Sequence, residues 1–462
     1  MLGRFESRNI LFMEQDGSWP IVWERAQGVH VWDADGKKYL DLTAAFGVAA
    51  AGHANPRVVK AGQKQMARLL HAMGDVHPHA LKARLARELS RITFERWHDF
   101  RRDEFHESPI SKSGKKTGTR ETRPSGKVIF SNSGFEAVES ALKTALLATG
   151  KRGVIAFESA YHGLGYGALN ATHREHFRRP FRSQLREFGH FVPFPKISEG
   201  RVPRVPEVRD SRNSSLRDVE SRIRQMFRRE KIGAILVEPI QARGGINLPP
   251  PEFLPLLRKL CDEHDALLIL DEIYTGFGRT GKWFACEHSG VIPDLICLGK
   301  ALTGGFPLSA CVGRADLMDA AWPASTGEAI HTSTFLGHPV GCAMALAQIS
   351  EIKKLKLPER AAILGAELLK QLSILHPPSS ILISARGLGL MAGVELTLPG
   401  GKPATESALT AIKTLLHRGC IFLPEGEHAN VISFTPPLTI TRAQLAKAVA
   451  ALNQVLTTDG HR

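Results

Sequence analysis

Two ionisable residues stand where apolar segments of this chain end, and their types suit the chemistry of a buried site. Lys300 follows the apolar run 295–298, and Asp271 closes the run 266–270. A lone ammonium or carboxylate is costly to bury unless it is paired, reacts or is neutralised. An Asp and a Lys at neighbouring strand ends would form a buried pair in which each lowers the desolvation cost of the other.

Further residues at the ends of apolar runs complete a pattern that suits one ligand. Ser133 and Gly134 form a turn that enters a helix, where free N–H groups and the helix dipole attract an anion, and Tyr161 offers a flat ring. Each feature alone is common in turns and helix caps. Together with Lys300 and Asp271 they fit pyridoxal 5′-phosphate (PLP), whose aldehyde needs an amine, its ring nitrogen an acid and its phosphate a helix N-terminus.

The elements that must position these residues alternate in type along the middle of the chain. Nearly continuous apolar strands separated by helices, such as those expected at 135–149 and 251–265, indicate an α/β fold with a mostly parallel sheet covered by helices. In such sheets ligands bind outside the carboxyl ends of the strands. The predicted strands occupy residues 127–132, 153–159, 232–240, 266–274, 294–300 and 308–313.

The two flanks of the chain differ from its middle. A "DADG" turn within 28–42 predicts a β-hairpin, and the segment after about residue 345 predicts antiparallel strands and helices. We therefore expect an N-terminal segment, 1–75, that contributes to a small α+β domain. A large PLP-binding domain, 76–340, and the C-terminal part of the small domain, 341–462, complete the predicted organisation.

The net charge of +14 raises the question of nucleic-acid binding. The basic excess lies in 101–127 and 173–187, neither of which has interleaved aromatic residues or a helix-turn-helix pattern. We interpret both as solvated surface or a rim that faces substrate, and we predict no nucleic-acid partner. Residues 101–126 lack an apolar period, so we expect a disordered basic insertion there.

Cysteine and histidine usage indicates neither disulfides nor a metal site. The six cysteines are far apart with no C-x-x-C pair, and His53, His162, His331 and His338 lack metal-ligand spacing, so we take all four as structural. The N-terminus has no long apolar region, and no run of eighteen apolar residues occurs. We expect a cytoplasmic enzyme with no membrane association.

Several blocks of the sequence together resemble a known family. They are "IFSNSGFEAVESALKTALLATGK", "VEPIQARGG", "LILDEIYTGFGRTGKWFACEHSGVIPDLICLGKALTGGFPLSA" and "TSTFLGHPVGCAMALA". The chain resembles the class III (ω-amino acid type) aminotransferases from about residue 18 to about 455, interrupted by the basic insertion. These are PLP enzymes of the aspartate-aminotransferase-like fold type I, so the resemblance implies a seven-stranded-type sheet in the large domain.

The resemblance also implies roles around the cofactor ring. Lys300 would hold PLP as a Schiff base and move the proton in the reaction, and Asp271 would pair with the pyridinium nitrogen. Ile273 would pack on one ring face and Tyr161 would stack on the other. Tyr274 stands where many relatives have a Gln that reaches the ring hydroxyl, a bond that a phenol can also make.

The resemblance places other residues at the cofactor phosphate. Ser133, Gly134 and Phe135 would grip it, and because Phe135 replaces a more usual Thr or Ala, only its backbone N–H could contribute. Ser333 and Thr334 match the segment that reaches the phosphate from the neighbouring subunit. A homodimer with active sites shared between subunits follows.

The implied activity is a transaminase that moves an amino group from a primary amine or amino acid to an oxo acid in a ping-pong cycle. The alternative is a related PLP-dependent aminomutase or lyase. Relatives that bind ornithine derivatives or ω-amino acids commonly carry Arg where this chain has Leu164 and Ser433. Acetylornithine, ornithine and 4-aminobutyrate are therefore doubtful donors, and a bulkier or less acidic amine is credible. Arg243 either supplies a relocated carboxylate clamp or pairs with a neighbouring acid.

Overall fold

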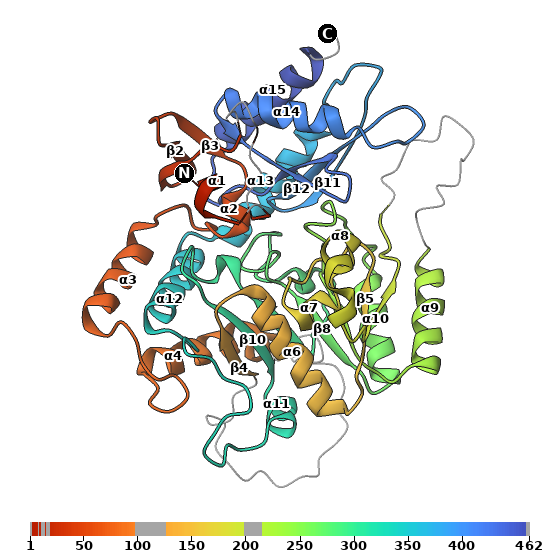
Figure 1. The fold of residues 1–462 in the computed structure, drawn as a ribbon. Helices are drawn as coiled ribbons and strands as arrows, with labels where there is room; N and C mark the ends of the chain where they lie inside the picture. The colour runs from red at the N-terminus through yellow and green to blue at the C-terminus, as the bar shows by residue number, and fades with distance from the viewer. Residues whose placement is uncertain are drawn as a thin grey trace, which may run out of the picture.

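A seven-stranded sheet forms the centre of the molecule (Figure 1). The computed structural model describes residues 2–7, 9, 10, 14, 19–97, 126–197 and 215–458. Five neighbouring strands run parallel, and β10 runs antiparallel between β9 and the edge strand β4. The mostly parallel sheet predicted from the apolar runs is thus confirmed. In spatial order its strands are β4 (Gly126–Ser131), β10 (Ser309–Arg314), β9 (Leu295–Leu298), β8 (Leu267–Asp271), β7 (Ile232–Val237), β5 (Gly153–Phe157) and β6 (Gly189–Val192).

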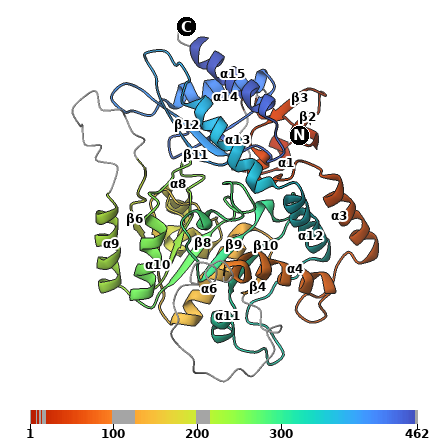
Figure 2. The same cartoon turned by 180° about the vertical axis from the view of Figure 1, so that it is seen from behind.

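Helices cover both faces of this sheet, which explains why its strands are apolar throughout (Figures 1 and 2). Helix α6 packs through Ala137 and Val138 on one face, and α10 packs through Phe253 and Leu257 on the other. The two helices match the segments predicted at 135–149 and 251–265. The longer helices are α3 (Pro56–Arg68), α4 (Ala80–Ser90), α6 (Gly134–Thr149), α9 (Leu216–Arg229), α10 (Phe253–Glu263), α11 (Ala315–Ala321), α12 (Pro339–Lys354), α13 (Leu357–Leu372), α14 (Thr405–His417) and α15 (Arg442–Thr458).

Short helical segments connect the larger elements, and several of them lie beside the strand ends. A π-helical turn at Arg91–Glu95 extends α4. The other short segments are α1 (Leu2–Phe5), α2 (Ala44–Gly47), α7 (Tyr166–Leu169), α8 (Glu175–Arg178) and the 3-10 turns Arg179–Gln184, Ala285–His288 and Lys300–Leu302.

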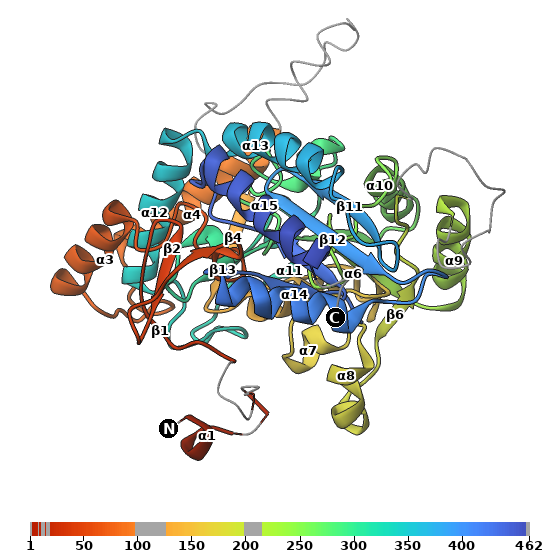
Figure 3. The same ribbon diagram turned by 90° about the horizontal axis from the view of Figure 1, so that it is seen from above.

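The ends of the chain meet in a four-stranded sheet beside the large one (Figure 3). The predicted hairpin is present as β2 (His30–Asp33) and β3 (Lys38–Asp41), preceded by β1 (Trp23–Gln27). The C-terminal strand β13 (Cys420–Ile421) adds to β3 in parallel. Residues near 40 and near 420 therefore share one sheet, as expected if both flanks build the smaller unit.

A second four-stranded sheet is antiparallel throughout and belongs to the C-terminal segment. Helix α12 begins just before the predicted boundary at 340 and packs against α3. The division into 1–75, 76–340 and 341–462 stays a prediction. The strands of this sheet, in spatial order, are β11 (Leu382–Leu388), β12 (Met391–Thr397), β15 (Val431–Phe434) and β14 (Leu423–Glu425).

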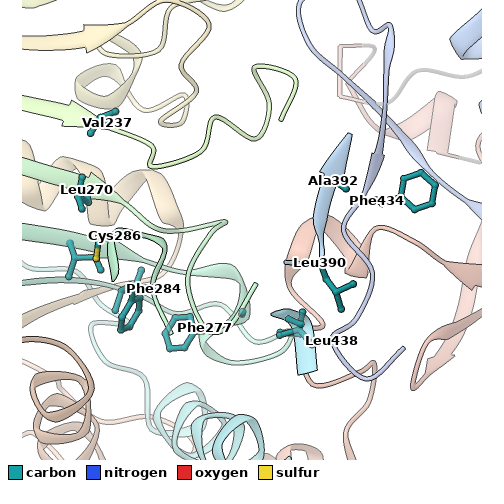
Figure 4. Close-up of a cluster of buried hydrophobic side chains, with 14 of the residues drawn as sticks. Val237, Leu270, Phe277, Phe284, Cys286, Leu390, Ala392, Phe434 and Leu438 are labelled. Atoms are coloured by element: carbon teal, nitrogen blue, oxygen red, sulfur yellow. The ribbon is translucent and has the colours of Figure 1, made fainter. Parts of the chain in front are cut away.

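An apolar cluster and one buried arginine join the C-terminal segment to the large sheet. Figure 4 shows Phe277 and Phe284, from the loop after β8, between the strand residue Leu270 and the C-terminal Leu438. Arg279, only 2% exposed, donates hydrogen bonds from Nη1 to the carbonyls of Leu390 (3.0 Å) and Pro436 (2.5 Å). The "TGFGRTG" block is therefore the packing joint between the two parts.

Three further predictions concern the basic insertion, the cysteines and membrane spans. Residues 98–125 lie outside the described residues, so the predicted disorder of the basic insertion stays a prediction. The six cysteines are buried free thiols. Within the described ranges, no helix is both long enough and apolar enough to span a bilayer.

Candidate active site

Lys300 begins a 3-10 turn immediately after β9 and Gly299, at the carboxyl end of the parallel strands. Its φ of 30° is in the region that non-glycine residues rarely adopt, and such strain is concentrated at functional sites. Burial lowers the pKa of Lys300, which Asp271, Glu238 and Glu425 partly oppose. An amine of this kind holds its proton less tightly than a surface lysine and is more available as a nucleophile or base.

Asp271 ends β8, the strand next to β9, and its carboxylate is held from two sides. The backbone N–H of Ile273 donates to Oδ1 at 3.1 Å, and Nδ1 of His162 lies 2.8 Å from Oδ2. The His162 ring is fully buried, and within the described part of the chain its Nε2 has no hydrogen-bond partner. The histidine therefore orients Asp271, a role that its interpretation as structural did not anticipate.

A cavity of about 400 Å³ connects these residues. This volume is within the range of small-molecule and cofactor sites. Residues from the ends of four parallel strands and from the start of α6 reach it, as expected for a ligand site at the carboxyl edge of a sheet. The lining residues are Gly134, Phe135, Tyr161, His162, Gly163, Leu164, Glu238, Ile240, Ala242, Arg243, Asp271, Ile273, Tyr274, Thr275 and Lys300.

The N-terminus of α6 forms one wall of the cavity. Ser133 is the N-cap, and its N–H and hydroxyl both donate to Oε2 of Glu136, at 2.7 and 2.9 Å. A Cβ on Gly134 would come within 2.9 Å of Ile273, so only glycine allows this close approach. Gly163 packs still more closely, since a Cβ there would come within 2.3 Å of Phe135. The wall thus presents backbone N–H groups at a helix start, which favours an anion.

The residues predicted to contact the cofactor ring line the cavity. Tyr161 and Ile273 both line it, and Phe177 packs on Tyr161 with ring centroids 5.6 Å apart. Nζ of Lys300 lies 4.5 Å from the ring centroid of Tyr274. The Tyr274 hydroxyl is 3.1 Å from Oγ1 of Thr435, so in this structure the phenol is already engaged.

Glu238 follows β7 and closes the floor of the site. Its carboxylate accepts the backbone N–H groups of Tyr161 (3.0 Å) and Ala242 (3.1 Å), so it fixes both segments that carry lining side chains. Burial raises the pKa of Glu238 to about 7, which the neighbouring His162 partly opposes. The carboxyl holds the loops in place while adding little negative charge below neutral pH.

Arg243 lies at the cavity and makes an ion pair with a buried acid from the C-terminal sheet. Its Nη1 is 3.6 Å from Oε2 of Glu425, the last residue of β14. Burial raises the pKa of Glu425 to about 7, and Arg243 is the strongest opposing influence. Of the positions where relatives carry Arg, Leu164 lines the cavity, whereas Ser433 is buried and donates to the Leu423 carbonyl.

Ser333 and Thr334 do not line this cavity. They lie in the loop before α12, where Thr332 donates to Asp75 at 2.6 Å. The Ser333 hydroxyl is buried and has no partner among the described residues. A single chain does not test a contact with a neighbouring subunit, so their predicted role stays a prediction.

Sequence reasoning thus named most of the cavity but missed His162, Glu238 and Glu425 as site residues. Glu238 ends an apolar strand as Asp271 does, and that shared signal marks it as a residue of the same sheet edge without assigning it a role. His162 and Glu425 carry no comparable signal, because each meets its partner across more than 100 residues of sequence.

Comparisons with known proteins agree with this fold. An amine transaminase from an uncultivated Pseudomonas species, solved in a PLP-bound form, has a TM-score of 0.81 at 27% identity over 98% of both chains. The ornithine aminotransferase of Toxoplasma gondii has a TM-score of 0.76 at 26% identity over 98% of this chain and 93% of that one. The fold is therefore that of the PLP fold type I transaminases.

Sequence comparisons narrow the class. The acetylornithine aminotransferase of Methanosarcina mazei is 35% identical over 96% of this chain and 93% of that protein. The putrescine aminotransferase of Pectobacterium atrosepticum is 36% identical over 95% and 83%. The family model described as "Aminotransferase class-III" matches residues 12–456. The chain belongs to the class III aminotransferases, which are PLP-dependent enzymes that transfer amino groups, as the resemblance predicted.

Proposed function

We propose that this chain transfers an amino group from a primary amine or amino acid to an oxo acid in a ping-pong cycle, with PLP bound through Lys300. The observation that carries this proposal is the position of Lys300 and Asp271. They stand at the carboxyl ends of adjacent parallel strands and line one cavity.

The residues present fit the cofactor. A helix start with close-packed glycines suits its phosphate, a buried lysine of lowered pKa suits its aldehyde, and a carboxylate held by His162 suits its ring nitrogen. Gly134 and Phe135 would hold the phosphate, with Ser133 at the cap and with Ser333 and Thr334 of a neighbouring subunit. Bound PLP supplies an aldehyde that condenses with amines and a ring that withdraws electrons from the adjacent carbon.

The chain's own residues would do the remaining work. Lys300, whose pKa burial lowers, releases its proton more readily than a surface lysine and takes and returns the proton at Nζ. Asp271 is kept in one orientation by His162 and the Ile273 N–H. Tyr161 and Ile273 border the cavity and exclude water from the two faces of a flat ligand. Tyr274, engaged with Thr435, would turn toward the ring hydroxyl.

The proposal includes a homodimer with shared sites, and an apolar patch beside Ser333 and Thr334 supports it. The segment 69–76 lies against this loop, since a Cβ on Gly74 would meet the Leu336 carbonyl at 2.2 Å. An exposed patch of this kind marks an interaction surface. Its exposed apolar side chains are Leu69, Leu70, Met73, Val76, Ile330 and Phe335. Buried free thiols are suited to a reducing compartment, and we propose the cytoplasm.

The donor is proposed to be an amine whose binding does not require an arginine at Leu164 or Ser433. The similar proteins named above act on acetylornithine, putrescine and ornithine according to their names, so the family itself does not fix the donor. Leu164 is 48% exposed at the cavity and offers an apolar surface. This supports an amine with an apolar or uncharged body over a short ω-amino acid.

Absorption spectra of the PLP-loaded protein, recorded before and after the addition of each amine in a panel, test the proposal. We expect a visible band that some amines bleach and that an oxo acid restores, and Lys300→Ala should lack this cycle. A band that bleaches but never returns with any oxo acid would favour an aminomutase or lyase. No band after PLP addition would contradict the assignment of the site.

A further inference from the structure

The cavity offers few groups that could neutralise a carboxylate. Among the described residues that line it, Lys300 is the only lysine and Arg243 the only arginine. The reaction itself requires Lys300, which leaves Arg243 for the carboxylate. Leu164 and Ser433 carry no charge. Every oxo acid carries a carboxylate, whereas a primary-amine donor need not, so the acceptor imposes the stronger demand for a cation.

The backbone of Arg243 is firmly fixed by the C-terminal segment. Its carbonyl accepts the N–H of Gly426 at 3.1 Å. Arg386 donates to the neighbouring carbonyls of Gly245 (2.5 Å) and Ile246 (2.9 Å). The Cα atom of residue 243 is therefore held beside the cavity, which removes much of the ordering cost of using its side chain as a binding group.

The guanidinium, in contrast, is loosely paired. Its ion pair with Glu425 spans 3.6 Å, longer than a hydrogen bond, while Arg386 approaches Glu395 to 2.6 Å. Arg243 remains 31% exposed at its side chain. Its guanidinium carbon lies 5.8 and 5.9 Å from the rings of Tyr161 and Phe46, which border the cation without using its N–H donors. Donors of the fork thus remain available for a bidentate carboxylate.

We propose that Arg243 binds the carboxylate of the oxo-acid acceptor, and that Glu425 is the counter-ion that the acceptor displaces. The inference rests on the proposed transamination and names the residue that recognises its second substrate. It also joins the two interpretations of Arg243 that the sequence left open. The arginine pairs with an acid before the acceptor binds and clamps the carboxylate of the acceptor afterwards.

The charges around Glu425 are consistent with this exchange. Arg243, Lys300 and Arg174 favour its ionised form, and Glu238 disfavours it. Glu425 is only 3% exposed, so its charge needs a partner, and Arg243 provides one until an acceptor binds. Glu425 therefore competes with the carboxylate of the acceptor for the guanidinium of Arg243.

Two acceptors of nearly the same shape provide the test. 2-Oxobutyrate carries a carboxylate where propanal has its aldehyde hydrogen. Each is added to enzyme that has already taken an amino group from a donor. For Arg243→Gln we expect KM for 2-oxobutyrate to rise at least ten-fold and KM for propanal to change less than two-fold. Arg243→Lys should lie between, because a lysine keeps the charge but loses the fork.

A binding measurement without turnover complements the kinetics. Glutarate, a dicarboxylate without an amino or oxo group, should bind the wild-type holoenzyme in calorimetry, bind Arg243→Gln at least ten-fold more weakly and bind Glu425→Gln more tightly. Arg222→Gln is the matched control, since Arg222 is an exposed residue of α9.

The outcomes separate the two levels of the argument. If Arg243→Gln raised KM equally for 2-oxobutyrate and propanal, or left glutarate binding unchanged, the role of Arg243 would be overturned. The proposed transamination would remain intact. If the wild-type enzyme accepts an amino group but returns it to neither acceptor nor to any oxo acid, the proposed function fails instead.

Discussion

At the residue scale, the site depends on a carboxylate whose orientation is set by a buried histidine. His162→Leu removes the group that lies 2.8 Å from Oδ2 of Asp271. A hydrogen bond to a charged group contributes about 1.5–3 kcal/mol, so we expect PLP to bind roughly 10- to 100-fold more weakly. Fluorescence titration of the apoprotein with PLP measures this change.

A conservative variant distinguishes orientation from packing. His162→Asn keeps an amide N–H near the position of Nδ1 and should recover much of the affinity, although it leaves more space than leucine does. If the Leu and Asn variants bound PLP equally well, the hydrogen bond to Asp271 would have no role in holding the cofactor.

The pH dependence of acceptor binding belongs to the same scale. Burial raises the pKa of Glu425 to about 7, so the acid is neutral below that pH and charged above it. The charged form competes for Arg243, and we expect KM for 2-oxobutyrate to increase as pH rises through 7. Between pH 6 and pH 8 the ionised fraction of such a group changes about ten-fold, which sets the upper limit of the effect.

Glu425→Gln provides the control for this profile. Burial also raises the pKa of Glu238 to about 7, so this group titrates in the same pH range, and burial lowers the pKa of Lys300. The Gln variant should retain their contribution while losing the part that depends on Glu425. If the steady-state KM changed with pH in the same way in the wild type and in Glu425→Gln from pH 6 to pH 8, Glu425 would not compete with the acceptor for Arg243.

At the scale of elements, the joint between the two parts of the chain depends on Arg279. Its burial lowers the pKa of Arg279 to about 10, yet it satisfies two carbonyls of the C-terminal segment. Arg279→Met keeps most of the volume but leaves both carbonyls unpaired. We expect the free energy of unfolding to fall by about 2–4 kcal/mol, as urea denaturation measures.

An exposed arginine gives the matched comparison for Arg279. Arg222→Met, on the outer face of α9, should change stability by less than about 0.5 kcal/mol. If the free energy of unfolding fell by a similar amount in the two variants, the Arg279 hydrogen bonds would add nothing beyond a general effect of removing a positive charge.

The sequence predicted elements well where a single physical rule determines them. Strands buried on both faces are continuous apolar runs. Four of the seven central strands lie within predicted runs, and two more, β4 and β10, are displaced from theirs by one residue. The short strand β6, "GHFV", was not predicted, because two of its four residues are polar or glycine. A four-residue edge strand carries too weak a pattern to distinguish it from a loop.

The site was predictable to the extent that it lies at strand ends. Lys300 and Asp271 follow apolar runs, and the topology of a parallel sheet brings such ends together. The contacts of His162 with Asp271 and of Arg243 with Glu425 depend on how loops and the C-terminal sheet pack. No local pattern encodes those distances, so only the folded chain reveals them.

At the scale of the whole molecule, the proposed active site needs two chains, and that requirement permits complementation. Lys300→Ala removes the lysine from one chain, while the double variant Ser333→Ala, Thr334→Val removes the two hydroxyls offered to the neighbour. We expect each variant alone to lose most of its activity. Mixed dimers would contain one site with an intact lysine and intact hydroxyls, because those groups come from different subunits.

Dissociating and reassociating an equal mixture of the two variants should therefore restore transaminase activity. Half of the dimers are then mixed and each has one intact site of two, which sets the recovery at about one quarter of wild type. Phe335→Asp, placed in the exposed apolar patch, should block both the dimer in size-exclusion chromatography and the recovery. If the mixture stayed inactive although mixed dimers were present, Ser333 and Thr334 would not serve the site of the neighbouring subunit.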